Sequence, residues 1–465
     1  MNTDFARRGA LWRIHGLAAI VATPFLLAAA VTGLLYVATP QVEAWRYAQL
    51  DAATPAPWLP LDRLVQAAEA AAPAGMRLRN VMPPRAPGDT LRATFAPPPA
   101  AAQAAPDPHG QHARPPGAEP SAALAADAVA VAVPGGVAVP VGVAVAADKL
   151  VVYVDPGNAR VLGTQAEQAR YSAWAKSLHA SLLQGDGWRW MIEWAATCLL
   201  VMLLSGLALW WPRRGRVFVP QRGARGRLAW QQWHAFTGFA LALMSLAIVL
   251  TGLTWSRYAG EQIRSLRDQI GQAPPRAPAG LQSAPADGAV RLSWQDVWDR
   301  ARSVAPEAAL QISPPRGPQG VWRINNVDRG QPTQRLDLQL DASTGQTLFF
   351  AGWQQQTVFS KATAVGIPFH RGEFGWWNQL LLALFGVAVI FSTVTGWVMW
   401  FKRRRSGWLG LVALPAQAWR SVPWRWPVLG VALALCGLAP LLLVFLALLL
   451  LVEWHAARST ARVAA

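Results

Sequence analysis

The chain has 465 residues, of which 53% are hydrophobic and only 14% are charged, whereas a soluble globular domain carries about 25% charged residues. This deficit, together with 25 tryptophans against 5 tyrosines, excludes an ordinary soluble protein and indicates membrane-spanning helices with aromatic belts. The net charge of +17 comes largely from basic residues beside apolar runs, so it indicates membrane topology and no nucleic-acid partner.

Five charge-free runs are long enough to cross ~30 Å of hydrocarbon, which takes about 20 helical residues. In chain order they are Ile14–Val42, Trp194–Pro212, Leu228–Ser256, Phe374–Phe401 and Trp426–Val452. The first run is too long for a signal-peptide core and lacks a clear cleavage site, so we expect it to be a membrane helix. Pro440 in the last run predicts either a kinked helix or a short re-entrant hairpin.

Basic residues assign the two sides of the membrane. They precede the first run, fill the link between the second and third, and follow the fourth, so the positive-inside rule places these three regions and the N-terminus in the cytoplasm. The two long segments then lie outside, in a periplasm-like space. The predicted order is a transmembrane helix at 8–42, an outer module at 43–187, a helix at 188–212, a cytoplasmic link at 213–227, a helix at 228–256, a second outer module at 257–373, a helix at 374–401, a second link at 402–425 and a fifth helix at 426–452.

The chain repeats itself. His15 is followed by Thr32-Gly33-Leu34, and His234 is followed by Thr251-Gly252-Leu253 at identical offsets. The second and fourth runs match at Ser205-Gly206 and Thr395-Gly396, and the outer segments match at two further places. Agreement at several sites in one order predicts an α-helical integral membrane protein built by tandem duplication of a helix–outer module–helix unit, with a fifth helix appended.

Each outer module has the pattern of a small α+β unit. Short helices are expected at Pro60–Ala72 and Ser293–Val304, and strands at Val151–Val154 and Leu336–Leu340, where turn residues follow. An insert rich in Ala, Pro, Val and Gly at about 96–147 enlarges the first module and is expected to be flexible.

Four of the seven histidines occupy duplicated positions, His15 with His234 and His179 with His370. A single histidine near a membrane helix is more often structural or interfacial than a ligand. Four in two matched pairs favour a functional role, because ionisable groups in or beside a span are costly. Neutral imidazole is well suited to ligate haem iron.

Depth predicts how the four ligands pair. His15 lies 21 residues before Tyr36, or about 31 Å along a helix, so it belongs at the cytoplasmic face, and the repeat gives His234 the same depth. His179 and His370 precede the second and fourth runs and belong at the outer face. Each pair is predicted to hold one haem iron, and an iron with both axial positions filled passes single electrons. No catalytic residue is assigned beyond these four metal ligands.

Other residues leave alternatives open. The glycines at 33, 206, 252 and 396 would admit either a flat macrocycle or a neighbouring helix. Glu193 would either tune the outer haem or pair with Arg189 at the interface. His109 and His112 are expected in a solvated loop, and His455 at the membrane interface.

The contexts of the histidines resemble the PepSY-associated transmembrane family. The resemblance rests on Trp12-x-x-His15, Leu178-His179, Trp233-His234 and Pro368-Phe369-His370-Arg371-Gly372, and it spans residues from about 8 to about 405. The outer strands look like PepSY modules, although Ala159 stands where such a module usually has glycine. Within the family the chain is similar to di-haem ferric-siderophore reductases, which implies two b-type haems, a bacterial inner-membrane location with periplasmic outer modules, and electrons delivered outward to siderophore-bound iron.

The sequence therefore leads us to expect a haem-dependent ferric reductase for iron acquisition. Its acceptor would be a ferric siderophore, and its donor an unidentified quinol or cytoplasmic reductase. Two alternatives remain: a non-redox PepSY-type protein that binds a peptide or regulates a partner, and a transporter subunit. The transporter is disfavoured because the spans carry few charges and show no paired broken helices.

Overall fold

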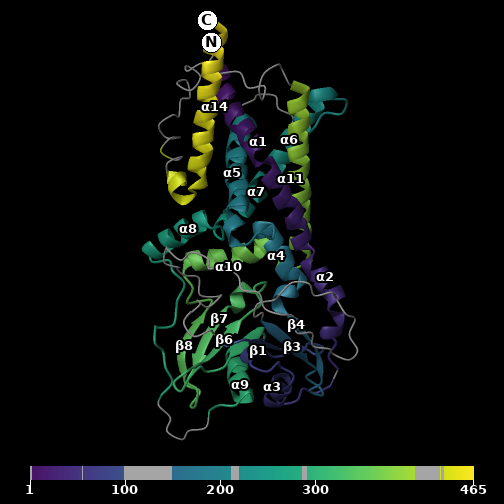
Figure 1. The fold of residues 1–465 in the computed structure, drawn as a ribbon, viewed down its shortest axis with the longest axis vertical. Coiled ribbons are helices and arrows are strands. Elements are labelled where there is room, and N and C mark those ends of the chain that lie inside the picture. Colours follow the sequence, from purple (N-terminus) through teal and green to yellow (C-terminus); the bar gives the residue numbers. More distant parts are fainter. Residues whose placement is uncertain are drawn as a thin grey trace.

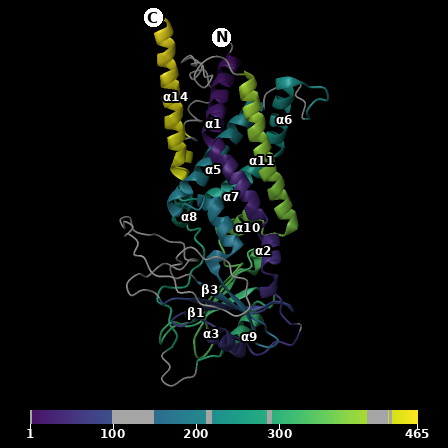
Figure 2. The ribbon, with the colours of Figure 1, turned by 45° about the vertical axis from the view of Figure 1, so that its right-hand side comes forward.

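The computed structural model describes residues 3–54, 56–98, 149–210, 219–284, 291–403, 430 and 434–464. A bundle of long helices stands on a β-sheet, with a layer of short helices between them (Figures 1 and 2). Both termini lie at the end of the bundle that is remote from the sheet. We call the two ends of the bundle its terminus side and its sheet side.

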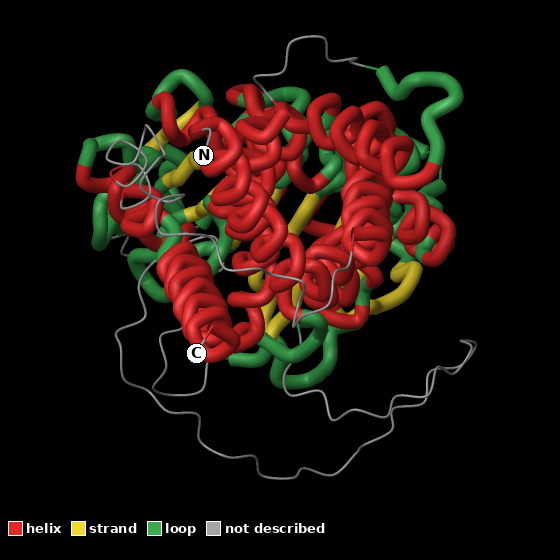
Figure 3. The backbone as a smooth tube through the Cα atoms, turned by 90° about the horizontal axis from the view of Figure 1, so that it is seen from above, coloured by secondary structure: helices red, strands yellow, loops and turns green. Residues whose placement is uncertain are grey.

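The bundle consists of α1, α5, α6, α7, α11 and α14 (Figures 1 and 2). Figure 3, viewed from above, shows helices gathered over the strands of the sheet. Their bounds are α1 Thr3–Val37, α5 Trp190–Trp210, α6 Gly226–Ala240, α7 Ala242–Leu253, α11 Trp376–Arg403 and α14 Leu441–Ala464. Helix α1 packs against both α5 and α11. Four of the described helices are long and apolar enough to cross a membrane, and the pair α6–α7 would make a fifth span if it counts as one. The chain is therefore a membrane protein.

Two of the expected spans differ from straight helices. The run expected at 228–256 is divided at Leu241, which leaves the helical conformation, and α6 and α7 meet at 56°. The run expected at 426–452 lies partly outside the described residues. Its described part breaks at Ala439 and Pro440, and α14 begins at Leu441, because proline removes a backbone donor and collides with the preceding turn.

Short helices lie between the bundle and the sheet or lead into it. Helices α4, α8 and α10 run beneath the sheet side of the bundle in Figure 1. The bounds of the short helices are α2 Thr39–Arg46, α4 Tyr171–Ser181, α8 Tyr258–Gln269 and α10 Val358–Arg371, with single 3₁₀ turns η1 Ala48–Leu50, η2 Glu167–Ala169, η3 Asp186–Arg189 and η4 Pro332–Gln334.

One antiparallel sheet of eight strands collects both outer segments, in the order β4-β3-β2-β1-β5-β6-β7-β8. The strands are β1 Arg77–Met82, β2 Leu91–Ala96, β3 Leu150–Val154, β4 Val161–Ala166, β5 Leu310–Ser313, β6 Trp322–Asn326, β7 Leu336–Leu340 and β8 Thr347–Gly352. Strands β1 and β5 meet antiparallel, with Val81 opposite Ile312. The two modules expected from the sequence thus contribute four strands each to one continuous sheet, which the sequence did not predict.

Helices α3 Leu61–Ala70 and α9 Trp294–Val304 cover one face of this sheet. Each buries an apolar stripe, which for α3 includes Leu64 and for α9 includes Val297. These side chains pack in a single core with Phe95 and Ile312 of the strands. The core therefore runs across the junction between the two segments.

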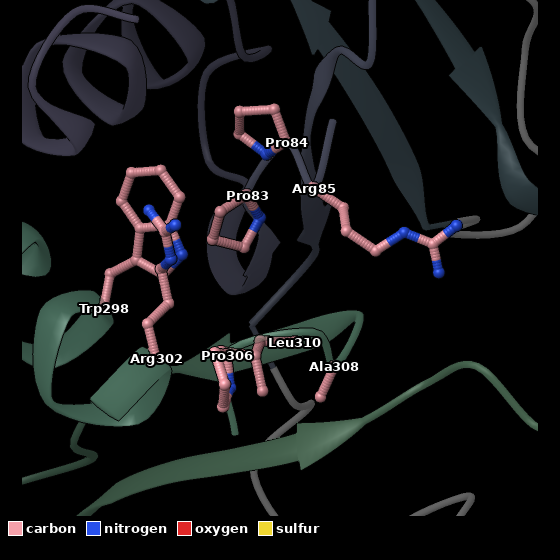
Figure 4. Close-up of a pocket in the computed structure, with 8 residues that line it drawn as sticks. All are labelled: Pro83, Pro84, Arg85, Trp298, Arg302, Pro306, Ala308 and Leu310. Atoms are coloured by element: carbon pink, nitrogen blue, oxygen red, sulfur yellow. The ribbon is translucent and has the colours of Figure 1, made fainter. Parts of the chain in front are cut away.

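A small cavity lies at the junction of the two segments, between the end of β1 and the start of β5 (Figure 4). It is lined by Pro83, Pro84, Arg85, Trp298, Arg302, Pro306, Ala308 and Leu310. Its volume of about 20 Å³ holds about one water molecule. It is too small to bind a cofactor or substrate.

Candidate haem-binding site

The structure brings His15 and His234 together at the terminus side of the bundle. Their imidazole rings have centroids 6.2 Å apart and planes at 89°. Two imidazoles that bind one metal ion through bonds of ~2.0 Å would place their ring centres about 6.3 Å apart. The spacing of this pair therefore fits two imidazoles that would share one metal ion.

Each ring of this terminus-side pair is fixed by the helix that it faces. The Nδ1 of His15 on α1 lies 3.1 Å from the Met202 carbonyl oxygen and 3.1 Å from Ser205 Oγ, both on α5. Because a carbonyl oxygen only accepts, Nδ1 carries the proton and donates it. In a neutral imidazole the lone pair is then on Nε2, which is left to bind a metal.

His234 on α6 repeats this arrangement against α11. Its Nδ1 lies 3.0 Å from the Ser392 carbonyl oxygen and 3.0 Å from Thr395 Oγ1. Both rings of the terminus-side pair thus have the same tautomer, with Nε2 available. Hydrogen bonding of the second nitrogen to a carbonyl is the usual support of a metal-binding histidine.

The sheet-side pair, His179 and His370, lies on the short helices α4 and α10. The Nδ1 of His179 is 3.0 Å from Thr32 Oγ1 on α1. The Nδ1 of His370 is 3.0 Å from the Ile248 carbonyl oxygen on α7 and 3.2 Å from Thr251 Oγ1. The pattern of a hydroxyl on a facing helix therefore occurs at all four histidines.

The electrostatics of His179 indicate that its partner is close. Burial, and secondly the proximity of His370, lower the pKa of His179 to about 4. Burial lowers the pKa of His370 in the same direction. The direction of both shifts favours the neutral imidazole, the form that ligates metal.

A glycine follows each of the four hydroxyl residues and makes room for the histidine. A Cβ placed on Gly206, Gly33, Gly252 or Gly396 would lie 3.2, 3.4, 3.0 or 3.7 Å from the Cε1 of the facing imidazole. The sequence left a macrocycle or a neighbouring helix as the reason for these glycines. In the structure an imidazole edge occupies the space.

Sequence reasoning missed the hydroxyl partners, although their signal was present. The repeated dipeptides Ser205-Gly206, Thr395-Gly396, Thr32-Gly33 and Thr251-Gly252 were used only to align the two halves. Each is the site at which one histidine docks. Each of α1, α5, α7 and α11 contains one such hydroxyl residue before a glycine. This pattern marks the position on each helix that a histidine faces.

The described contacts of Glu193 do not include the expected pair with Arg189. Its side chain is 1% exposed, and its carboxylate accepts the backbone N–H groups of Tyr258 at 2.9 Å and Ala259 at 2.8 Å. Arg189 instead donates to the Trp255 carbonyl oxygen. Glu193 therefore holds the first turn of α8 against α5, because a helix N-terminus attracts an anionic acceptor.

Three further histidines lie outside the two matched pairs. His109 and His112 lie outside the described residues. His455 lies on α14, whose Glu453 pairs with the buried Arg13 of α1 at 3.0 Å. Among the residues that the structure describes there is no group of three or more His, Cys, Asp or Glu that would hold a bare metal ion. Paired histidines without carboxylates are a donor set for porphyrin iron.

An open depression of about 430 Å³ lies where the chain leaves α10. It is lined by Asp328, Gly330, Gln331, Glu373, Phe374, Gly375 and Trp377. Glu373 is three residues from His370, and the rings of Phe374 and Trp377 are parallel within 2°. Its size is within the ~300–1,000 Å³ that small-molecule sites occupy.

The helices and the histidine arrangement define an integral membrane protein with a β-sheet domain at one end of its bundle. A family model, the PepSY-associated TM region, matches residues 12–403, and the chain belongs to this family. The match covers all four paired histidines and ends before α14. A comparison with curated proteins found no match.

Proposed function

We propose that the protein is a di-haem b oxidoreductase that carries electrons across a bacterial inner membrane to ferric iron. The observation that carries this proposal is the set of four histidines, each with Nδ1 bound to a facing helix and two of them 6.2 Å apart. His15 with His234 and His179 with His370 would hold the two haems. A haem held by two imidazoles supplies one-electron transfer.

The chain's own residues supply positioning. Ser205, Thr395, Thr32 and Thr251 orient the imidazoles, and the glycine after each lets the ring approach. Hydrogen bonding at Nδ1 also raises the basicity of the ligand. His15 lies in the first half of α1 and His179 contacts Thr32 near the other end of that helix, so the two sites would lie towards opposite ends of the bundle.

The direction of transfer follows from the basic residues. The arginines of the N-terminus and of the links at 213–227 and 402–425 favour a cytoplasmic terminus side. The sheet would then be periplasmic, as would the depression lined by Glu373 and Trp377. A ferric siderophore that occupies this depression would lie near the end of α10, the helix that bears His370. Reduction to Fe(II) would weaken the hold of its hard oxygen ligands. The donor would be a quinol or a cytoplasmic reductase.

The matched positions support an origin by duplication of a helix–module–helix unit. The strands of the two segments occupy mirrored places in the sheet order, and α3 and α9 occupy equivalent places on its face. A transporter would be expected to break helices in corresponding positions of both halves. Here α6–α7 is bent, whereas α1, its counterpart in the repeat, continues through Pro24.

Proteoliposomes with a reductant enclosed and a ferric hydroxamate chelate outside test this function. We expect two b-type haems per chain and release of Fe(II) to a ferrous chelator. The variant His179→Ala should retain the terminus-side haem and lose iron release. A colourless protein that releases no iron would contradict the proposal and favour the alternative of a non-redox PepSY-type binding or regulatory protein.

A further inference from the structure

Three cations gather around the sheet-side histidines. Lys176 lies one turn before His179 on α4, and Arg371 follows His370 directly on α10. Arg329 comes from the loop between β6 and β7. That loop packs closely on the end of α10, since a Cβ on Gly330 would collide with the Glu373 carbonyl oxygen. Cations from three separate elements thus meet beside the two ligands.

Only one of these three cations forms an ion pair among the described residues. The Arg371 guanidinium pairs with Glu373 at 2.9 Å. Within the described ranges, neither Lys176 nor Arg329 has an ion pair or a side-chain hydrogen bond. Partial burial, and secondly the charge of Arg371, lower the pKa values of both groups. The repulsion by Arg371 exceeds the attraction of Glu373 on Arg329 and of Glu167 on Lys176. This excess of positive charge favours an anionic ligand.

Arg371 is fixed between the two halves of the site. Its Nε donates to the Tyr36 hydroxyl at 2.9 Å, and Tyr36 lies three residues beyond Gly33, the glycine against which His179 rests. The guanidinium therefore connects the helix that supports one ligand with the helix that bears the other. Its remaining nitrogen, Nη1, has no hydrogen-bond partner among the described residues. A guanidinium held in this way presents donors suited to a carboxylate.

We propose that Arg371, with Lys176 and Arg329, binds a propionate carboxylate of the haem held by His179 and His370. This placement rests on the proposed function. A haem b carries carboxylates at one edge only, and a charge beside the hydrocarbon must be paired or reach water. The cations lie at the sheet side of the bundle, where that edge would leave the hydrocarbon. Lys176 and Arg371 each lie within one turn of one of the two histidines, which favours a haem carboxylate over an anionic lipid headgroup or a ferric chelate.

The test uses the full chain with His15→Ala and His234→Ala, which leaves only the sheet-side pair. The protein, made without haem, is titrated with haem b and with its dimethyl ester, in which both carboxylates are masked. We expect Arg371→Gln to weaken haem binding about tenfold, the value of roughly one charged hydrogen bond. The ester should bind the His15→Ala, His234→Ala protein about as weakly as haem b binds the same protein with Arg371→Gln added. Adding Arg371→Gln should not weaken ester binding further.

Two variants control for folding. Arg371→Lys keeps the charge and should retain part of the affinity, and Arg323→Gln on the exposed side of β6 should change neither titration. Equal weakening of haem and ester by Arg371→Gln would overturn the placement, since the arginine would then act on the fold. The placement would also be overturned if Arg371→Gln left haem binding unchanged but slowed the reduction of an anionic ferric chelate. The three cations would then bind the electron acceptor. Absence of any haem uptake by the unsubstituted full chain would instead overturn the proposed function.

Discussion

Asp62 and Gln295 each cap the helix on which the other lies. The carboxylate of Asp62 on α3 accepts the N–H groups of Trp294 at 2.9 Å and of Gln295 at 3.2 Å. The Gln295 side-chain oxygen accepts the N–H of Leu61 at 2.8 Å in return. Because helix N-termini leave N–H groups unpaired, this exchange satisfies donors of α3 and α9 and joins the two outer segments.

The substitution Asp62→Ala should expose the first turn of α9. Loss of a capping side chain costs about 1 kcal/mol, so hydrogen exchange at the amides of Trp294 and Gln295 should accelerate roughly fivefold. Glu69→Ala on the exposed side of the same helix is the control and should leave these amides unchanged. Equal exchange in the two variants would show that the cap does not hold α9.

Ala159 adopts a left-handed conformation with φ of 59°, and Gly345 adopts φ of 70° at the matching place of the second segment. Both N–H groups donate to the carbonyl oxygen of an aspartate four residues earlier. A left-handed alanine is strained by roughly 1–2 kcal/mol. We therefore expect Ala159→Gly to raise the thermal unfolding midpoint by a few degrees.

The reverse change, Gly345→Ala, is the counterpart of this test. It should lower the midpoint, both because φ is positive and because the new Cβ would lie 2.6 Å from the Arg300 guanidinium carbon. Calorimetry of the full chain in detergent measures both variants. A lower unfolding midpoint for Ala159→Gly would contradict the claim that the backbone at Ala159 is strained.

The stability of the sheet should depend on Asp341 at low pH. Burial alone would raise the pKa of Asp341, but hydrogen bonds from the N–H groups of Thr344, Ala284 and Ser343 lower it to about 2. A depressed folded pKa gives stability that is complete above the unfolded value of about 3.9 and is lost as the pH falls towards 2.

The measurement is the unfolding midpoint between pH 6 and pH 3. The unsubstituted protein should lose stability steeply below about pH 4, and Asp341→Asn should start lower and show a flatter profile across that window. Parallel profiles for the two proteins would show that another carboxylate governs the acid sensitivity.

Gly252 should be required for the sheet-side haem. A Cβ there would lie 3.0 Å from Cε1 of His370, whereas a Cβ on Gly16 would meet nothing within 4 Å. Displacing the imidazole by a few tenths of an ångström should weaken the ligand bond, so Gly252→Ala should lower the haem content from two per chain towards one. Gly16→Ala should retain two haems, and equal haem content in both variants would contradict the role of the glycine.

Local patterns in the sequence predicted much of what the structure contains. The helices expected at Pro60–Ala72 and Ser293–Val304 appear as α3 and α9, and the expected strands appear as β3 and β7. The pairing of His15 with His234 followed from equal depth in two matched spans. These features depend on periodicity, turn residues and helical rise, which are encoded within short stretches of chain.

Features that depend on distant contacts were not predictable in this way. The pairing of β1 with β5 depends on two strand edges that the sequence does not mark as exposed or covered. The partners of Glu193 were not among the alternatives that the sequence offered, because the N–H groups at the start of α8 carry no side-chain signal. The bend at Leu241 occurs without proline or any other local breaker at that residue.

A redox titration of the purified full chain, followed by visible absorption, tests the central claim most directly. The account predicts two one-electron transitions with b-type haem spectra. His15→Ala with His234→Ala should remove one, and His179→Ala with His370→Ala should remove the other. Absence of porphyrin absorption, or both transitions persisting in either double variant, would contradict haem ligation by these histidines.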